Sequence, residues 1–322
     1  MAEYINIRGQ NIEVVASDPA NPTLGQIWYN STSNTLKGEG LQAAAWATGN
    51  NMNTARFILA GAGTQTAGLA FGGYTTANTG ATEEYDGNSW TNSNPLNTTR
   101  RGLGGCGTQT AALAFGGITT VNVGATEEYD GTSWASNPTG LNTARVTLAG
   151  AGTQTAALAF GGNTPPPANT GATEEYNGST WTSNPTGLNT ARATLGGCGT
   201  QTAALAFGGE SPTTGATEEY NGSTWATSPG SLNTASYALA GCGTQTAALA
   251  FGGFGTAITG ATEEYDGNSW ATSNPLNTAR RNLGGAGTQT AALAFGGSTP
   301  PYTNATEEYT GAAPTTVTIT AS

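Results

Sequence analysis

A ten-residue phrase, TQTAALAFGG with slight variants, occurs six times along this chain of 322 residues. Its phenylalanine recurs at intervals of about 45 residues, at Phe71, Phe115, Phe160, Phe207, Phe251 and Phe295. Each copy is followed by a variable stretch and then by TEEY. Periods of this length are typical of solenoids, propellers and other arrays of small units. The repeat therefore predicts one main body of six equivalent units rather than two ordinary domains.

The composition predicts that these units are all-β. Glycine is abundant, with 49 residues, and only 9% of the residues are charged, which favours turns and tightly packed strands over long salt-bridged helices. The first repeat contains short segments typical of strands, punctuated by Gly72-Gly73 and Asp86-Gly87. These segments are residues 56–63, 67–71, 81–85 and a fourth that starts at 89–91. Four antiparallel strands in each radially repeated unit form a propeller blade.

The order of landmarks within each repeat is specific. An arginine, a strand, Gly-Gly, Tyr-Asp-Gly, a tryptophan and a Pro-Leu-Asn stretch follow one another, and this order resembles the kelch repeat over roughly Trp46 to Tyr309. The resemblance and the number of repeats together predict a six-bladed kelch-like β-propeller of four-stranded antiparallel blades. A short N-terminal β-hairpin extension precedes it.

One repeat is short of its outer strand. Five of the six TEEY copies are followed by a tryptophan, namely Trp90, Trp134, Trp181, Trp225 and Trp270. Trp46 stands alone before the first repeat, so we predict that its segment supplies the missing strand and closes the ring. The alternating tail Thr315–Thr320 is the competing candidate. All six tryptophans are interpreted as structural residues that fill the gaps between neighbouring blades.

The paired glutamates of TEEY invite a catalytic interpretation, because glycoside hydrolysis uses two carboxylates. Adjacent strand residues point to opposite faces, however, so these two do not converge, and we interpret them as structural. The glutamate on the tyrosine's face should be partly buried between blades and paired with the arginine that begins most repeats, at Arg56, Arg100, Arg145, Arg192 and Arg280. The fifth repeat has Ser236 instead. Its glutamate should lack an ion pair and either turn toward water or hold its proton more tightly.

The stretch after Gly-Gly differs in every repeat, whereas the GTQT turn is the same in all six. Alternating strand direction places the variable stretches on one face, and rigid scaffolds commonly present binding residues on such loops. The kelch resemblance implies the same binding face. The candidate binding residues are Tyr74, Ile118, Asn163, Pro165, Glu210, Phe254 and Tyr302. The alternative is that unconstrained loops have simply diverged.

Several classes of function are disfavoured. The chain has no histidine, which removes the usual catalytic triads and imidazole metal sites, and no phosphate-binding glycine loop. We therefore expect no enzyme, no cofactor and no metal site, and we interpret the aspartates of the Asp-Gly turns as turn formers. The net charge of −11 and the absence of a basic stripe argue against nucleic acid and anionic lipid. Cys106, Cys198 and Cys242 share one repeat position and are expected to be buried free thiols.

The first 45 residues do not follow the repeat. No basic region followed by an apolar run appears in the start MAEYINIRGQNIEVV, and no apolar segment is long enough to cross a bilayer. The phrase DPANPTLGQIWYNSTSNTLKG predicts a loop, a strand over 26–29, a turn over 30–34 and a return strand over 35–37. It resembles hairpin modules of tail-fibre and other virion proteins of tailed bacteriophages. In its low lysine content and its near-identical repeats, the chain also resembles the kelch-like proteins of marine phages.

This resemblance implies a virion protein that is made in the host cytoplasm. Residues 1–45 would attach it to other virion proteins, and residues 46–322 would form the propeller that binds a host-surface glycan or protein. Oligomerisation is expected of a virion part, although no heptad encodes it. The alternatives are a capsid decoration protein without a specific receptor, a carbohydrate-active enzyme and an intracellular kelch-type scaffold.

Overall fold

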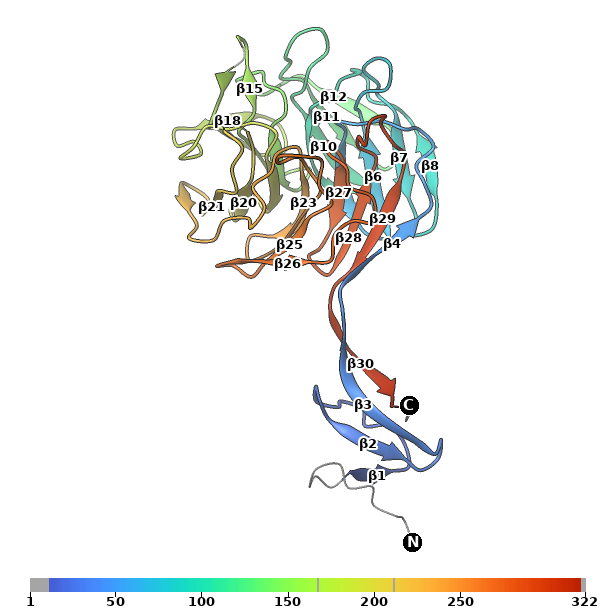
Figure 1. The fold of residues 1–322 in the computed structure, drawn as a ribbon. Helices are drawn as coiled ribbons and strands as arrows, with labels where there is room; N and C mark the ends of the chain where they lie inside the picture. The colour runs from blue at the N-terminus through green and yellow to red at the C-terminus, as the bar shows by residue number, and fades with distance from the viewer. Residues whose placement is uncertain (1–11, 167, 211, 320–322) are drawn as a thin grey trace. The chain divides into compact units, whose positions relative to one another are not determined.

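The computed structural model describes residues 12–166, 168–210 and 212–319, and these residues are all-β (Figure 1). No helix in the described part of the chain is long and apolar enough to cross a membrane. The start MAEYINIRGQN, whose composition predicts no export signal, lies outside the described residues. The chain divides into two compact units, which we call the terminal unit (Met1–Ala45 with Gly311–Ser322) and the repeat body (Trp46–Thr310).

The terminal unit contains one sheet with the strand order β1-β2-β3-β30. Its strands are β1 (Glu13–Val15), β2 (Ile27–Asn30), β3 (Thr35–Gln42) and β30 (Ala313–Thr318). The antiparallel pairing of β2 with β3 confirms the predicted hairpin. Trp28 is fully buried, and its Nε1 donates a hydrogen bond to Asp18 Oδ1 at 3.0 Å. The tail strand β30 pairs antiparallel with β3, so strands from both ends of the chain meet in this sheet.

The repeat body contains six four-stranded sheets, in which the first, second and third strands pair antiparallel. The first strands are β5 (Ala60–Thr64), β9 (Gly104–Thr108), β13 (Ala149–Gly152), β19 (Gly196–Gly199), β23 (Ala240–Thr244) and β27 (Gly284–Gly287). The second strands are β6 (Ala67–Phe71), β10 (Ala111–Phe115), β14 (Ala157–Phe160), β20 (Ala204–Phe207), β24 (Ala247–Phe251) and β28 (Ala291–Phe295).

The TEEY copies form the third strands and the tryptophans begin or lie in the fourth. The third strands are β7 (Thr82–Tyr85), β11 (Thr126–Tyr129), β17 (Thr173–Tyr176), β21 (Thr217–Tyr220), β25 (Thr262–Tyr265) and β29 (Thr306–Thr310). The fourth strands are β8 (Trp90–Ser93), β12 (Trp134–Asn137), β18 (Trp181–Asn184), β22 (Trp225–Thr227), β26 (Trp270–Ser273) and β4 (Ala45–Gly49). A two-stranded ribbon, β15 (Asn163–Thr164) with β16 (Ala168–Asn169), lies in the third repeat.

The last sheet is completed by the N-terminal side of the chain. Its order is β27-β28-β29-β4, so the strand that holds Trp46 takes the outer place that the sixth repeat leaves vacant. Of the two segments that the sequence left open for this place, Trp46 occupies it and the tail does not. Residues 315–318 of the tail pair with β3 instead, and residue 320 lies outside the described residues.

The first strands begin later than the sequence predicts. The expected strand over residues 56–63 starts only at Ala60, because Ile58 adopts a left-handed conformation with φ of 54° that breaks the extended backbone. Phe57 lies in an isolated antiparallel bridge with Tyr74. The three residues after Arg56 therefore belong to the loop side of the sheet.

Burial follows the position of each strand. Second strands are buried on both faces, with Leu69 and Phe71 fully covered, because each sheet packs between two others. Fourth strands bury mainly their tryptophan. The glycines of the first strands allow the sheets to approach closely: a Cβ on Gly61 would lie 2.6 Å from Phe295 Cζ.

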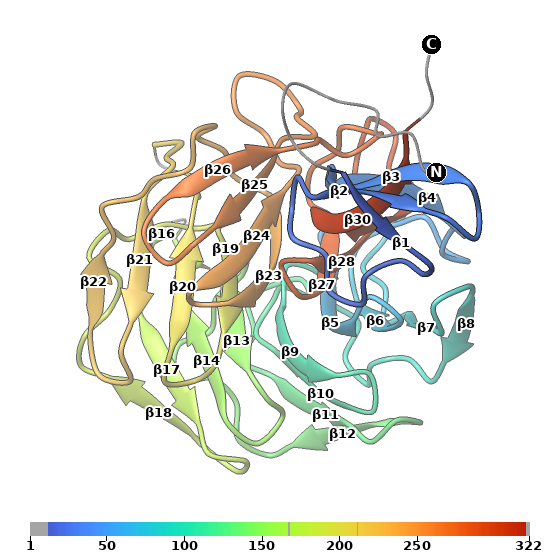
Figure 2. The same ribbon diagram turned by 90° about the horizontal axis from the view of Figure 1, so that it is seen from below.

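The first strands surround a common centre, as Figure 2 shows, and each contacts the first strands of the repeats before and after it, with β27 contacting β5. Just before each first strand, one residue donates its amide N–H to the carbonyl of the equivalent residue in the preceding repeat, and the series closes on itself. Ile58 N donates to Asn282 O at 2.9 Å, and Asn282 N donates to Ala238 O at 2.7 Å. All six residues have positive φ, namely Ile58, Gly102, Thr147, Thr194, Ala238 and Asn282.

Candidate functional site

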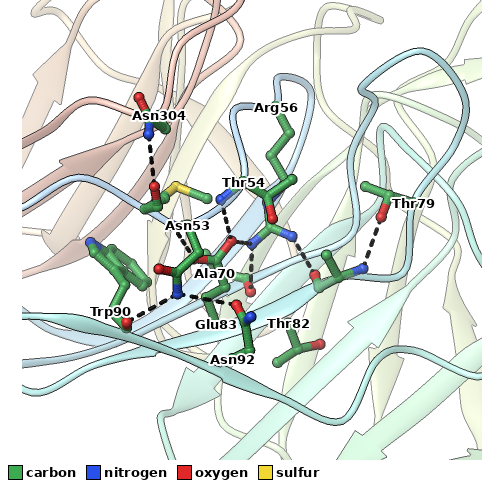
Figure 3. A network of polar contacts seen from close by, with 12 residues as sticks. Asn53, Thr54, Arg56, Ala70, Thr79, Thr82, Glu83, Trp90, Asn92 and Asn304 are labelled. Carbon is green, nitrogen blue, oxygen red and sulfur yellow. Dashed lines mark hydrogen bonds and ion pairs between the residues drawn. The ribbon is translucent and has the colours of Figure 1, made fainter.

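A buried ion pair positions the segment that leads into each first strand. Figure 3 shows the first repeat, in which Glu83 and Arg56 are both fully buried, 3.3 Å apart between Oε1 and Nη2. Glu83 also accepts hydrogen bonds from Asn53 N at 2.6 Å and Thr54 N at 3.2 Å, and Arg56 Nη1 donates to Ala81 O at 2.6 Å. Burial lowers the pKa of Arg56 to about 10, so the guanidinium remains charged at neutral pH.

The same pairing occurs in four other repeats, and it confirms the predicted partnership of arginine and glutamate. The pairs are Arg100–Glu127, Arg145–Glu174, Arg192–Glu218 and Arg280–Glu307. Each carboxylate binds the segment entering its own sheet through backbone N–H groups, so the pair fixes the loops beside it.

The fifth repeat lacks the arginine, and its glutamate stays buried. Glu263 is only 3% exposed and accepts hydrogen bonds from Asn233 N at 2.7 Å, Asn233 Nδ2 at 3.0 Å and Thr234 N at 2.8 Å. The expected turn toward water does not occur, because these three N–H donors hold the carboxylate inside. A cavity of about 10 Å³, lined by Ser236, Phe251 and Glu263 among others, lies beside it.

Three kinds of side chain join each sheet to the preceding one. In the second sheet, Trp134 Nε1 donates to Thr82 Oγ1 at 2.9 Å and Tyr129 donates its O–H to the Glu84 carboxylate. Gln109 Nε2, in the GTQT turn, donates to Tyr85 O at 2.7 Å. Burial, followed by the Glu84 hydrogen bond, raises the pKa of Tyr129 to about 12.

These contacts recur in every repeat, and the same contacts join the first sheet to the last. Gln65 of the first repeat donates to Tyr309 O at 2.6 Å, and Trp90 Nε1 donates to Thr306 Oγ1 at 2.9 Å. Trp46 Nε1 donates to Thr262 Oγ1 at 3.0 Å. The aromatic rings pack in the same intersheet gaps, with Trp134 centred 4.9 Å from Phe71. The tryptophans are therefore core residues.

The variable stretches lie side by side. In each repeat, the first residue of the variable stretch, which directly follows Gly-Gly, forms an antiparallel bridge with a second residue. This second residue directly follows the arginine of the repeat, or Ser236 in the fifth repeat. The six pairs are Phe57–Tyr74, Arg101–Ile118, Val146–Asn163, Ala193–Glu210, Tyr237–Phe254 and Arg281–Ser298. Amide side chains link successive loops: Asn78 Nδ2 donates to Ile118 O, Asn122 Nδ2 to Asn163 O and Asn169 Nδ2 to Glu210 O, at 2.9–3.1 Å. The predicted residues Tyr74, Ile118, Asn163 and Glu210 thus lie along neighbouring loops, which we call the loop face.

Aromatic and arginine side chains form two groups on the loop face. The first, the Tyr74 cluster, comprises Tyr302, Phe57, Tyr74 and Arg101. Phe57 stacks on Tyr302 with centroids 5.5 Å apart and contacts Tyr74 edge-on at 5.7 Å, while the Arg101 guanidinium lies 4.9 Å from the Tyr74 ring centroid. These four side chains are partly exposed and come from the sixth, first and second repeats.

The second group, the Phe254 cluster, repeats this design with Tyr237, Phe254 and Arg281. Tyr237 and Phe254 have centroids 5.5 Å apart, and the Arg281 guanidinium lies 4.9 Å from the Phe254 centroid. Ser298 bridges both Arg281 and Tyr302, which connects the two clusters through the backbone.

Of the predicted binding residues, Tyr74, Phe254 and Tyr302 lie in these two clusters, whereas Phe57, Arg101, Tyr237 and Arg281 were not among the predicted residues. The missed residues follow the arginine position and vary between repeats as much as the loops do, so a comparison of the repeats contained this signal. Pro165, another predicted residue, is exposed in the turn between β15 and β16 and contacts neither cluster through any ring or cation interaction among the described residues.

A central cavity of about 90 Å³ lies within the repeat body. It is lined by the six positive-φ residues and by one leucine from each repeat: Leu59, Leu103, Leu148, Leu195, Leu239 and Leu283. None of these lining side chains titrates, so the cavity offers no acid–base group. Its lining also includes the polar residues Thr147, Thr194 and Asn282.

The cysteines and turn aspartates occupy structural positions. Cys106, Cys198 and Cys242 are free and buried, as predicted, and burial raises the pKa of Cys106 and Cys198 to about 12. Asp86 Oδ1 accepts backbone N–H groups at 2.9 and 2.7 Å, which lowers its pKa. Within the described residues, no group of three or more Cys, Asp or Glu is placed to hold a metal ion.

The fold and the loop face define a class of protein: an all-β chain of tandem four-stranded antiparallel sheets whose invariant residues join the sheets and whose variable residues gather on adjoining loops. No protein-family model matches the chain, and no curated protein is significantly similar to it.

Proposed function

We propose that the six sheets of the repeat body are the blades of a closed, kelch-like β-propeller. The closed series of central amide hydrogen bonds supports this proposal, as do the glutamine and tryptophan contacts that lead from the first sheet to the last. The ribbon β15–β16 is then an insertion in the loop of the third blade, and the sheet of the terminal unit is not one of the blades.

The propeller belongs to a virion protein of a tailed bacteriophage and binds a glycan on the host surface through its loop face. The terminal unit attaches it to other virion proteins. The resemblance of the hairpin phrase and of the low-lysine repeats to phage proteins supports the virion assignment. The observation that carries the binding role is the pair of clusters, because unconstrained loops would not combine variable residues of successive repeats into the same ring–ring and guanidinium–ring contacts twice.

Substitution of the Tyr74 cluster tests the binding role. We expect Phe57→Ala and Tyr74→Ala each to weaken binding to isolated host envelope glycan by roughly tenfold, since a stacked aromatic contact contributes about 0.5–1.5 kcal/mol beyond its buried area. Binding is measured by biolayer interferometry on immobilised glycan. Val121→Ala is the control, because Val121 is 64% exposed in a variable stretch but belongs to neither cluster. Equal affinities for all variants would refute the role of the clusters.

The virion assignment is tested by looking for the protein in purified particles. Its presence in the tail supports a receptor-binding role, and its presence on the head without any host binding supports the decoration alternative. The proposal is of a binding protein and not an enzyme, so release of sugar from host envelope material by the purified protein would overturn that part.

A further inference from the structure

The positive charges of the described residues are almost all neutralised within the fold. Lys37 pairs with Asp18 at 2.6 Å, and five arginines pair with buried glutamates. Over residues 12–166, 168–210 and 212–319, the cationic side chains without an ion pair are Arg101 and Arg281, and both lie on the loop face. In a chain with a net charge of −11, these two arginines are the exceptional feature of that face.

The two arginines occupy the same repeat position, and each is held against an aromatic ring of the preceding repeat. Arg101 Nη1 donates to Asn78 Oδ1 at 2.6 Å while its guanidinium lies over Tyr74, so the plane of the group is fixed, and its other N–H groups make no hydrogen bond within the part of the chain that the structure describes. Arg281 lies over Phe254 in the same way, and its buried Nε has no hydrogen-bond partner among the described residues. A planar guanidinium fixed in this manner matches the two oxygens of a carboxylate or sulfate.

We infer that the ligand of the loop face is an acidic saccharide, whose carboxylate or sulfate groups bind Arg101 and Arg281 while its sugar rings lie against the aromatic side chains. This inference rests on the proposed glycan-binding function and adds the charge of the ligand. Glu210 belongs to the fourth repeat, two repeats away from Arg101 in the second and from Arg281 in the sixth, and it forms no ion pair with either arginine among the described residues.

The net charge of the protein favours a ligand that makes few, local ionic contacts. A nucleic acid carries a charge at every phosphate and would be repelled by a body of this net charge, because binding it requires many cations rather than two. A saccharide with spaced acidic groups needs only the two arginines and the rings beside them. Association should weaken with salt, because the attraction is between exposed charges.

Calorimetry with the full-length protein tests the inference with four probes: hyaluronate, whose carboxylate occurs on every second sugar, lightly sulfated dextran, neutral dextran and polyglutamate. We expect binding to at least one acidic saccharide, little binding to dextran and weaker binding at high salt. Arg101→Gln should lower the affinity for the acidic saccharide roughly tenfold or more, and Arg101→Lys should recover part of it, since lysine keeps the charge without the planar fork.

Asn177→Asp is the matched control, because it changes the net charge by the same amount as Arg101→Gln. Three other repeats have aspartate at this turn position, Asp86, Asp130 and Asp266, so the fold accommodates the change. This control should leave the affinity nearly unchanged. Thermal unfolding of each variant shows that it is folded.

Three results would overturn the inference. Equal binding of dextran and the acidic saccharides, unaffected by Arg101→Gln, would reject an acidic ligand and leave the proposed glycan-binding function intact. Equal binding of polyglutamate would show that the arginines recognise acidic groups on any polymer. No binding to any acidic probe would reject the inference, and the proposed function would fail with it only if host envelope glycan is also not bound.

Discussion

At the residue scale, one side chain per repeat decides whether a buried carboxylate is neutralised. Five repeats place an arginine beside the glutamate, and the fifth places Ser236 there, with a small cavity next to Glu263. A buried charge without a counter-ion destabilises a fold, although hydrogen bonds to backbone N–H groups offset part of this. The fifth repeat is therefore the place where a single substitution should stabilise the protein.

We predict that Ser236→Arg raises the free energy of unfolding by about 1.5–3 kcal/mol, the range for hydrogen bonds to charged groups. Urea unfolding measures the change. The gain should disappear when Glu263→Gln is added. The reverse change in the third repeat, Arg145→Ser, should lower the free energy of unfolding by about 3–5 kcal/mol. If Ser236→Arg is neutral or destabilising while Arg145→Ser is also tolerated, the ion pairs do not stabilise the repeats.

The sequence allowed this pairing to be predicted because strand alternation alone assigns Glu83 to the same face as Tyr85. It could not show that Glu263 would remain inside, since the three N–H donors that hold it come from a loop whose path depends on the fold. The second glutamate of each copy was also unassigned, and in the structure it accepts the tyrosine hydroxyl of the next sheet.

At the element scale, the GTQT turn is constant for a reason that its own sequence does not reveal. A tight turn requires no particular glutamine, yet every copy keeps one. In the fourth repeat, Gln201 Nε2 donates to Ala157 O at 3.0 Å and Tyr176 O at 2.6 Å, both in the preceding sheet. The turn is thus a connector between sheets, which only the arrangement of neighbouring sheets could show.

Gln201→Ala should lower the free energy of unfolding by about 1–3 kcal/mol, because two carbonyl groups between the sheets lose their donor. Thr202→Ala is the matched control, since Thr202 is exposed in the same turn. Chemical unfolding followed by tryptophan fluorescence gives both values. A glutamine variant as stable as the threonine variant would show that the carbonyl groups find other partners at no cost.

At the scale of the whole molecule, the number of sheets and the role of Trp46 could be predicted by counting: six TEEY copies, five following tryptophans and one unplaced tryptophan. The path of the tail could not be predicted in this way. Residues 313–318 alternate like any edge strand, and their partner β3 was expected to stop at Lys37, whereas it extends to Gln42 and offers six pairing positions.

Removing β4 should destabilise the repeat body severely. We compare chains spanning residues 45–310 and 51–310; the shorter one loses Trp46, whose ring lies 5.0 Å from both Phe251 and Tyr309. Loss of a buried tryptophan costs about 3–5 kcal/mol, so the shorter chain should melt many degrees lower. The Trp46→Ala variant of the full chain measures the contribution of the tryptophan side chain to stability separately from that of the strand. Equal melting temperatures for both truncated chains would mean that β4 is dispensable.

The meeting of both chain ends in one sheet has a mechanical consequence. The terminal unit is connected to the repeat body twice, through β4 and through β29, and these two strands are neighbours in the same sheet. We therefore expect tension on the terminal unit to be shared between the edge strand β4 and its neighbour β29, rather than to act on the edge strand alone. The β3–β30 pairing, six residues long, would have to shear before either strand carried the load alone.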